Sequence, residues 1–144
     1  MKPILRALAI LVCLILAACA GAISSGGGGQ QTPSPWEPQP GDENLAKGEA
    51  FVDQAEILIL ESFPPQFRLK LYGTLPTPCH QLRVVVSQPD AEERLNVEVY
   101  SVVDPNQVCI QVVEPFEANV PIGSYTSGEY IVLVNGEQVG EVKP

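Results

Sequence analysis

The chain has 144 residues, of which 45% are hydrophobic, and it carries 17 acidic residues against 8 basic ones. Nucleic acids and anionic lipid head groups repel a negative surface, so this balance argues against binding to either. If Lys2 and Arg6 are removed with a leader, six basic residues remain against 17 acidic ones, a formal charge of −11.

The first 18 residues have the order of a secretory signal peptide. Lys2 and Arg6 give a basic start, residues 7–18 form an uncharged apolar run, and small residues surround Cys19. The run is shorter than the roughly 20 residues that a transmembrane helix needs. We therefore predict a signal peptide over residues 1–18; the alternative is an N-terminal anchor helix that is never cleaved.

The four residues Leu16-Ala17-Ala18-Cys19 resemble the lipobox of bacterial lipoproteins. In that family the cysteine is lipidated on its sulfur, the signal peptide is cut before it, and the new amino group is usually acylated. The resemblance implies that lipid on Cys19 holds the mature chain on the extracytoplasmic side of a cell membrane. It also implies that Cys13, inside the apolar run, leaves with the leader.

Residues 19–50 are predicted to be a lipidated N-terminus followed by a disordered linker. Gly, Ser, Gln and Pro dominate this stretch, and it has no apolar periodicity, so it cannot bury enough apolar surface to fold. Trp36 stands alone within it. We interpret Trp36 as a stray linker aromatic; the alternative is that it docks on the domain or on a partner.

Residues 51–144 are predicted to form one domain of the all-β class. Apolar and polar residues alternate with period two, β-branched residues are frequent, and turn signals recur at short intervals. The expected strands are 54–60, 66–73, 80–88, 94–103, 107–114, 115–122, and a hairpin over 128–142 that turns at Asn135-Gly136. About seven short strands of this kind favour a single antiparallel β-sandwich.

The stretch SGEYIVLVNG, residues 127–136, resembles the late strands of bacterial immunoglobulin-like and fibronectin-type domains. The resemblance covers only this stretch. It implies that the sandwich is immunoglobulin-like.

A disulfide between Cys79 and Cys109 is predicted. These two cysteines remain once Cys13 is cleaved off and Cys19 carries lipid, and exported proteins retain disulfides. With each cysteine at the start of a strand and one strand between them, a flat meander would separate them by about 9.5 Å. Bonded cysteines tolerate at most about 7 Å between Cα atoms. The chain must therefore cross between sheets, or the first and third of these strands must be neighbours.

His80, the chain's only histidine, follows Cys79 directly. Consecutive strand residues face opposite ways and a bonded cysteine is no nucleophile, so a cysteine–histidine catalytic pair is disfavoured. No Gly-x-Ser-x-Gly motif is present either, and we predict no enzyme activity and no catalytic residue. We expect His80 to be a polar residue at the rim of the sheet, hydrogen-bonded to a turn.

We also predict no metal and no cofactor. A copper or zinc site built from Cys79, His80 and Cys109 would lack a fourth side chain. The acidic stretches 88–94 and 102–107 leave calcium open, although neither matches an EF-hand loop.

The stretch 72–80 is the best candidate for an interaction loop. Pro76 and Pro78 each fix one backbone angle, the cysteine that follows pins the loop's end, and Leu75 and His80 complete the candidate site. A loop stiffened in this way loses little entropy on binding, and an exposed Leu75 would anchor a partner. The simpler interpretation, which we favour, is that the prolines shape a turn between sheets.

These features favour an extracytoplasmic lipoprotein that acts as a non-enzymatic binding or structural module of the cell envelope. Its partners would be the membrane, through lipid on Cys19, and an envelope protein or polymer, but not nucleic acid. One alternative is a protease inhibitor that uses the 72–80 loop as a substrate mimic. Another is a metal- or redox-sensing lipoprotein that uses Cys79, His80 and Cys109.

Overall fold

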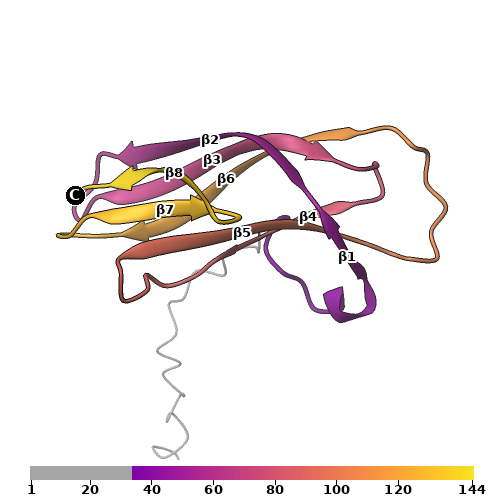
Figure 1. Cartoon of the computed structure of the whole chain (residues 1–144), viewed down its shortest axis with the longest axis horizontal. Coiled ribbons are helices and arrows are strands. Elements are labelled where there is room, and N and C mark those ends of the chain that lie inside the picture. The colour runs from indigo at the N-terminus through magenta and orange to yellow at the C-terminus, as the bar shows by residue number, and fades with distance from the viewer. Residues whose placement is uncertain (1–33) are drawn as a thin grey trace, which may run out of the picture. The chain divides into compact units, whose positions relative to one another are not determined.

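The computed structural model describes residues 34–144, which form a sandwich of one five-stranded and one three-stranded sheet (Figure 1). The elements are a 3₁₀ helix (Asp42–Asn44) and strands β1 (Ala46–Glu49), β2 (Phe51–Leu60), β3 (Gln66–Leu75), β4 (Gln81–Val86), β5 (Arg94–Val103), β6 (Glu114–Ser124), β7 (Tyr130–Val134) and β8 (Glu137–Val142). This confirms the predicted all-β sandwich. Within the described part of the chain, no helix is long and apolar enough to cross a membrane.

The core lies between the two sheets and is built by the period-two alternation of the strands. In β3 and β5 every second side chain is buried, because neighbouring strand residues point to opposite faces of a sheet. The six apolar residues that the alternation predicted to face inward are all buried: Phe67, Leu69, Leu71, Leu95, Val97 and Val99. The alternation therefore identifies the inner faces of both sheets.

Strand β5 is the centre of the larger sheet. β4 lies along one of its edges, while β1 and β7 share the other edge, β1 against Tyr100–Val103 and β7 against Arg94–Val97. The β5–β7 pair is parallel, and every other pair in the two sheets is antiparallel. This one pair departs from the predicted antiparallel arrangement, and the immunoglobulin-like assignment stays a prediction.

The chain changes sheets three times in its first six strands. β1 pairs in the larger sheet, and after Ala50 the chain enters the smaller sheet as β2, a crossing that Figure 1 shows. The second crossing returns the chain from β3 to the larger sheet as β4, and the third runs from β5 through residues 104–113 to β6, which pairs with β3. Residues 107–114 were predicted to be a strand, but the strand begins only at Glu114. That prediction was wrong because the segment has to span from one sheet to the other.

The predicted hairpin at Asn135-Gly136 is confirmed between β7 and β8. Both residues have positive φ, +49° and +88°, the backbone region that Asn and Gly accept most readily in a tight turn. The Asn135 side chain also binds the β5 backbone: Oδ1 accepts from the N–H of Val99 at 2.8 Å, and Nδ2 donates to its carbonyl at 2.9 Å. The turn residue thus extends the β5–β7 pairing beyond the end of β7.

Residues 34–50 belong to the domain, so the predicted linker over 19–50 was wrong for this part; residues 19–33 lie outside the described residues. The Val84 N–H donates to the carbonyl of Trp36 at 2.8 Å, and the Trp36 ring packs against the core. β1 then adds a strand to the larger sheet. Trp36 is therefore a docked residue and not a stray linker aromatic.

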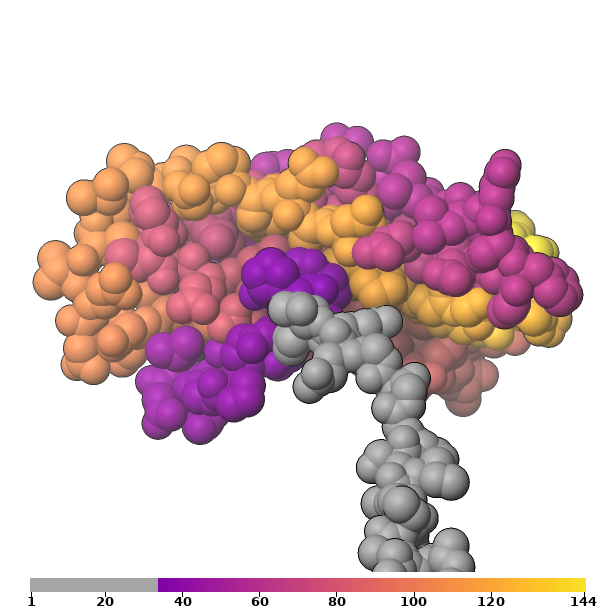
Figure 2. Space-filling model, turned by 180° about the vertical axis from the view of Figure 1, so that it is seen from behind, coloured from indigo at the N-terminus to yellow at the C-terminus, as the bar shows by residue number. Residues whose placement is uncertain are grey.

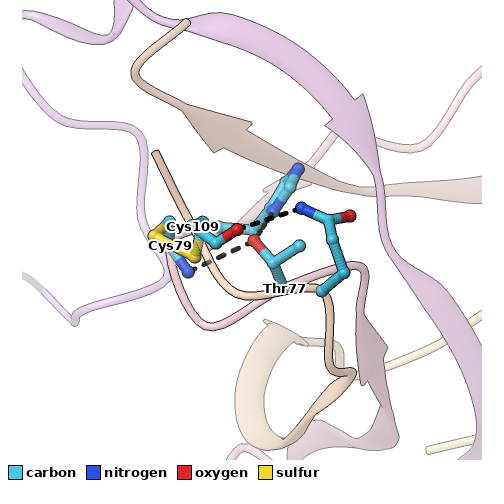
Figure 3. Close-up of a disulfide and its surroundings, with 5 residues drawn as sticks. Thr77, Cys79 and Cys109 are labelled. Carbon is cyan, nitrogen blue, oxygen red and sulfur yellow. Dashed lines mark hydrogen bonds between the residues drawn. A yellow bond between two sulfur atoms is a disulfide. The ribbon is translucent and has the colours of Figure 1, made fainter. Parts of the chain in front are cut away.

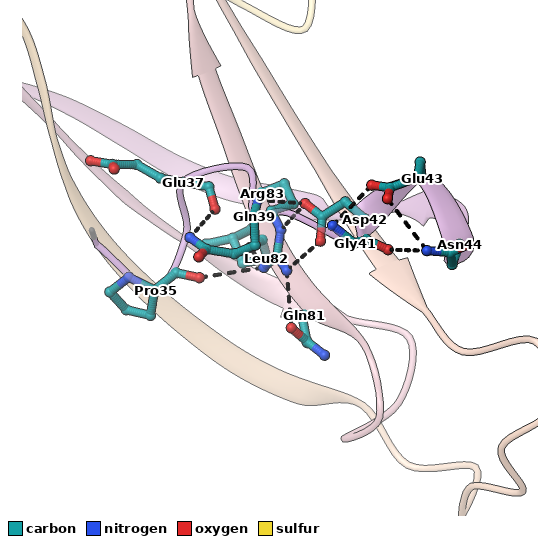
Figure 4. A network of polar contacts seen from close by, with 10 residues as sticks. All are labelled: Pro35, Glu37, Gln39, Gly41, Asp42, Glu43, Asn44, Gln81, Leu82 and Arg83. Atoms are coloured by element: carbon teal, nitrogen blue, oxygen red, sulfur yellow. Dashed lines mark hydrogen bonds and ion pairs between the residues drawn. The ribbon is translucent and has the colours of Figure 1, made fainter. Parts of the chain in front are cut away.

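An ion pair between Arg83 and Asp42 holds this N-terminal segment to β4 (Figure 4). Nε and Nη2 of Arg83 donate to the two carboxylate oxygens of Asp42 at 2.6 and 2.8 Å. The Arg83 side chain is only 2% exposed, and it also donates to the carbonyls of Pro35 and Leu82. A two-pronged arginine–carboxylate contact of this kind fixes geometry as well as charge. It explains how a segment without apolar periodicity is ordered.

We expect Asp42→Asn to lower the thermal midpoint of the domain, because it leaves the buried Arg83 guanidinium without its counter-charge. Arg83 keeps its carbonyl acceptors, so the loss should be smaller than that from breaking the disulfide. The hydrogen bond from Arg83 lowers the pKa of Asp42 from 3.8 to about 2. The ionised carboxylate therefore stabilises the fold above pH 3.8, and this contribution disappears as the pH falls toward about 2.

Thermal unfolding at neutral and acidic pH measures this effect. The difference between wild type and Asp42→Asn should be clear at neutral pH and should shrink as the pH approaches the lowered pKa. Glu92→Gln is the matched control, since Glu92 makes an exposed ion pair with Arg94 and surface pairs contribute little. Equal midpoints for the wild type and Asp42→Asn at neutral pH would contradict this assignment.

Candidate functional site

The predicted disulfide is present and joins two loops at one end of the sandwich (Figure 3). Cys79 lies in the loop between β3 and β4, Cys109 lies in the crossing segment 104–113, and their Cα atoms are 6.1 Å apart. The chain does cross between the sheets here, as the predicted bond requires. Cys109 was expected at the start of a strand; instead it lies within the loop, because no neighbouring strand pairs with this segment.

His80 belongs to the hydrogen-bonded turn beside the disulfide. Its Nδ1 lies 2.8 Å from the hydroxyl oxygen of Thr77, a buried residue whose hydroxyl also accepts from the N–H of Cys79. The His80 N–H donates to the Thr77 carbonyl at 3.1 Å. Gly48 lies beside this ring, and a Cβ there would be at ordinary contact distance from His80 Cδ2, 3.4 Å, but would come within 2.9 Å of Ser101 Oγ. The contacts are those of a polar residue that fixes a turn.

The disulfide also bears on the alternatives based on sulfur chemistry. With both sulfur atoms bonded to each other, Cys79 and Cys109 offer no thiolate to a metal and no nucleophile. Within residues 34–144, no group of three or more His, Cys, Asp or Glu side chains is arranged to hold a metal ion. Asp90, in one of the two acidic stretches, accepts hydrogen bonds from Arg94 and from turn N–H groups. These hydrogen bonds stabilise the turn over residues 90–94.

Leu75 corrects the expected interaction loop. It was placed on an exposed turn, but it is the last residue of β3, pairs with Glu114 of β6, and is only 5% exposed. The residues around it are a strand as far as position 75, so only the end of the 72–80 stretch is a loop. In that loop Pro76 is half-buried and Pro78 is exposed. The structure therefore supports the simpler interpretation, in which the prolines shape a turn.

The crossing segment 104–113 presents the apolar surface that was expected from Leu75. Val108 is 97% exposed and Ile110 is 68% exposed, and Val112 and Val113 are each more than half exposed. The segment forms one end of the sandwich, drawn in orange in Figures 1 and 2. This surface was not predicted, because the alternating apolar residues of the segment are also the pattern of one face of a buried strand. The absence of any charge from residue 107 to residue 113 was the available signal.

A cleft of about 800 Å³ opens between the start of β2 and the β7–β8 turn. Its lining includes the acidic residues Glu49, Asp53, Glu98 and Glu137, together with Lys47. The Lys47 ammonium pairs with Glu98 at 2.5 Å, and this hydrogen bond raises the pKa of the lysine. In residues 34–144, no buried side-chain polar atom lacks a partner. Nothing in the cleft's lining therefore points to a particular ligand.

A family model matches the chain. It is described as the ORF11 beta-sandwich domain and covers residues 69–143, from the middle of β3 to just beyond β8. The matched range includes both bonded cysteines and the whole crossing segment. No curated protein matches the chain. No solved structure matches it either.

Proposed function

We propose that this chain, which belongs to the ORF11 beta-sandwich domain family, is a non-enzymatic binding module of a cell envelope. Lipid on Cys19 would hold it on the extracytoplasmic side of the membrane. The order of basic, apolar and small residues before Leu16-Ala17-Ala18-Cys19 supports export and lipidation. The Cys79–Cys109 bond supports the same location, because disulfides persist in oxidising compartments and are rare in the cytosol.

One observation carries the binding role: the disulfide-tied segment 104–113 holds apolar side chains in water at one end of the domain. Exposed aliphatic side chains lose contact with water when a partner covers them, which stabilises a complex. The disulfide restrains the segment before any partner arrives, so less conformational entropy is lost on binding. The proposed binding surface is thus the crossing segment, and not the 72–80 stretch.

The two alternatives have less support. A protease inhibitor would need an exposed, strand-like loop at 72–80, and Leu75 is buried there. A metal or redox sensor that uses Cys79, His80 and Cys109 would first have to lose its disulfide. Neither alternative has a specific observation in its favour.

The anchor is tested by growing cells with a labelled fatty acid and isolating the chain. We expect label on the wild type and complete loss of label in Cys19→Ser, with either release from the membrane fraction or accumulation of the unprocessed form. Cys13→Ser is the matched control, because that cysteine precedes the proposed cleavage site and should leave labelling unchanged. Label that persists in Cys19→Ser, or an unlabelled wild type, would refute the anchor.

A further inference from the structure

Part of the crossing segment is a stretch whose backbone N–H groups have no hydrogen-bond acceptor among the described residues, although the Cys109 carbonyl accepts from the Gln111 side chain at 3.1 Å. The Gln107 N–H donates to the Asp104 carbonyl, and strand pairing resumes at Glu114. Between these points, no backbone N–H of residues 108–113 donates to any other residue in the described part of the chain. Backbone N–H groups in this state are available to a strand from another chain.

The side chains of the segment favour such a strand. Val108, Ile110 and Val112 alternate with Cys109 and Gln111, and β-branched residues are enriched in strands. Natural proteins usually protect exposed strand-like edges with charged side chains or proline. Residues 107–113 contain neither, in a chain with 17 acidic and 8 basic residues. The segment therefore has the composition of a strand that pairs, on a surface that otherwise repels copies of itself.

We propose that residues 107–113 pair antiparallel with the same residues of a second copy of this chain. The inference deepens the proposed function by naming the partner of the crossing segment; it rests on the proposed binding role but not on the lipid anchor. In a two-fold arrangement centred on Ile110, that residue faces its own copy and Val108 faces Val112 of the second chain. Val108, Ile110 and Val112 of both chains then form one continuous apolar face. The same residues of each chain make the contact, as a two-fold symmetric interface requires.

Charge supports this register. Glu114, the first acidic residue after the segment, would lie opposite Asn106 of the second copy, so no carboxylate faces another across the pair. Like charges directly opposite each other destabilise a strand pair. The uncharged run lets two copies of this acidic chain approach each other without a carboxylate in either paired strand.

Sedimentation equilibrium of the full chain in density-matched detergent tests the pairing. We expect the wild type to have the mass of a dimer at high concentration and Val108→Lys to stay monomeric, because each lysine would face an apolar Val112. Phe63→Lys is the matched control. Phe63 is 96% exposed against 97% for Val108, and it lies in the β2–β3 turn at the opposite end of the domain. At a concentration at which the wild type is monomeric, both variants should keep its melting temperature, and Phe63→Lys should still dimerise at high concentration.

A photoreactive amino acid at position 112 locates the contact in membranes of cells that express two differently tagged copies. The expected adduct joins the two tags and maps to the neighbourhood of Val108. A monomeric wild type, a dimer that survives Val108→Lys, or an adduct on another segment or another protein would each overturn the proposal. The fatty-acid labelling reports separately on the anchor. A lipidated protein that stays monomeric would rule out the pairing and leave the anchor standing, whereas an unlipidated dimer would rule out the anchor and leave the pairing standing.

Discussion

Replacing Cys79 and Cys109 together with alanine is expected to destabilise the domain by about 3–4 kcal/mol. The bond joins residues 30 positions apart, and the chain-entropy estimate for a loop of that size gives this magnitude. Since small domains have only about 5–15 kcal/mol of total stability, the thermal midpoint should fall by more than about 10 °C. Denaturant unfolding of the wild-type and double-alanine chains measures the loss.

The same variant should loosen the crossing segment selectively. Residues 108–113 have no backbone hydrogen bond to other described residues, so the disulfide is their main restraint between β5 and β6. Hydrogen exchange and proteolysis should increase there before they increase in β3 or β5. Cys79→Ala and Cys109→Ala alone should each destabilise the domain as much as the double variant, because either change removes the bond. A double variant within about 1 kcal/mol of the wild type would contradict the structural role assigned to this bond.

Leu75→Ala is the second large effect, with an expected loss of about 2–5 kcal/mol in the free energy of unfolding. Leu75 is 5% exposed and packs in the core cluster. Truncating a buried leucine removes apolar contacts and leaves a cavity, which accounts for losses of this size. Chemical denaturation of the full chain is the measurement.

The matched control for Leu75→Ala is Val108→Ala, at the fully exposed position of the crossing segment. That change should alter stability by no more than about 0.5 kcal/mol, as surface substitutions usually do. An unchanged unfolding midpoint for Leu75→Ala would mean that the leucine does not serve the core. It would also revive the interaction role first expected for the 72–80 stretch.

Local patterns predicted much of this fold. The alternation in β3 and β5 identified their buried faces, because strand geometry sends every second side chain to the same side. Asn135-Gly136 predicted the hairpin, because its two residues accept positive φ. The Cys79–Cys109 pairing followed from counting the cysteines left in an exported chain. Each of these predictions depends on chemistry that lies within a few residues of sequence or on a simple count.

The failures concern partners that are distant in sequence. Residues 107–113 alternate as a strand does, but alternation describes side chains and does not reveal whether another backbone lies alongside. Residues 34–50 lack an apolar period, yet Asp42 binds a buried arginine 41 positions later. The parallel pairing of β7 with β5 is possible because β1 covers only the last residues of that edge of β5 and leaves Arg94–Val97 free for β7. Tertiary contacts of this kind have no signature in a short window of sequence.

The same limit explains the misplaced candidate site. Leu75 was expected to be exposed because prolines follow it, but its position is set by pairing with Glu114 on β6. The exposed aliphatic residues occur where the sequence indicated a buried strand. A buried strand and an exposed loop can share this alternation, and only the exposure of the side chains in the folded chain distinguishes them. His80 was the exception: its contacts with Thr77 are local, and its role in the turn was predictable.

Mass spectrometry of the chain extracted from its own cell membrane, digested without reduction, tests whether the protein is exported, lipid-anchored and disulfide-bonded. An exported, anchored and disulfide-tied module predicts an N-terminal peptide that begins at a lipid-modified Cys19. It also predicts a peptide containing Cys79 linked to one containing Cys109. A mature chain that begins elsewhere without lipid, or Cys79 and Cys109 both recovered as free thiols, would contradict the account.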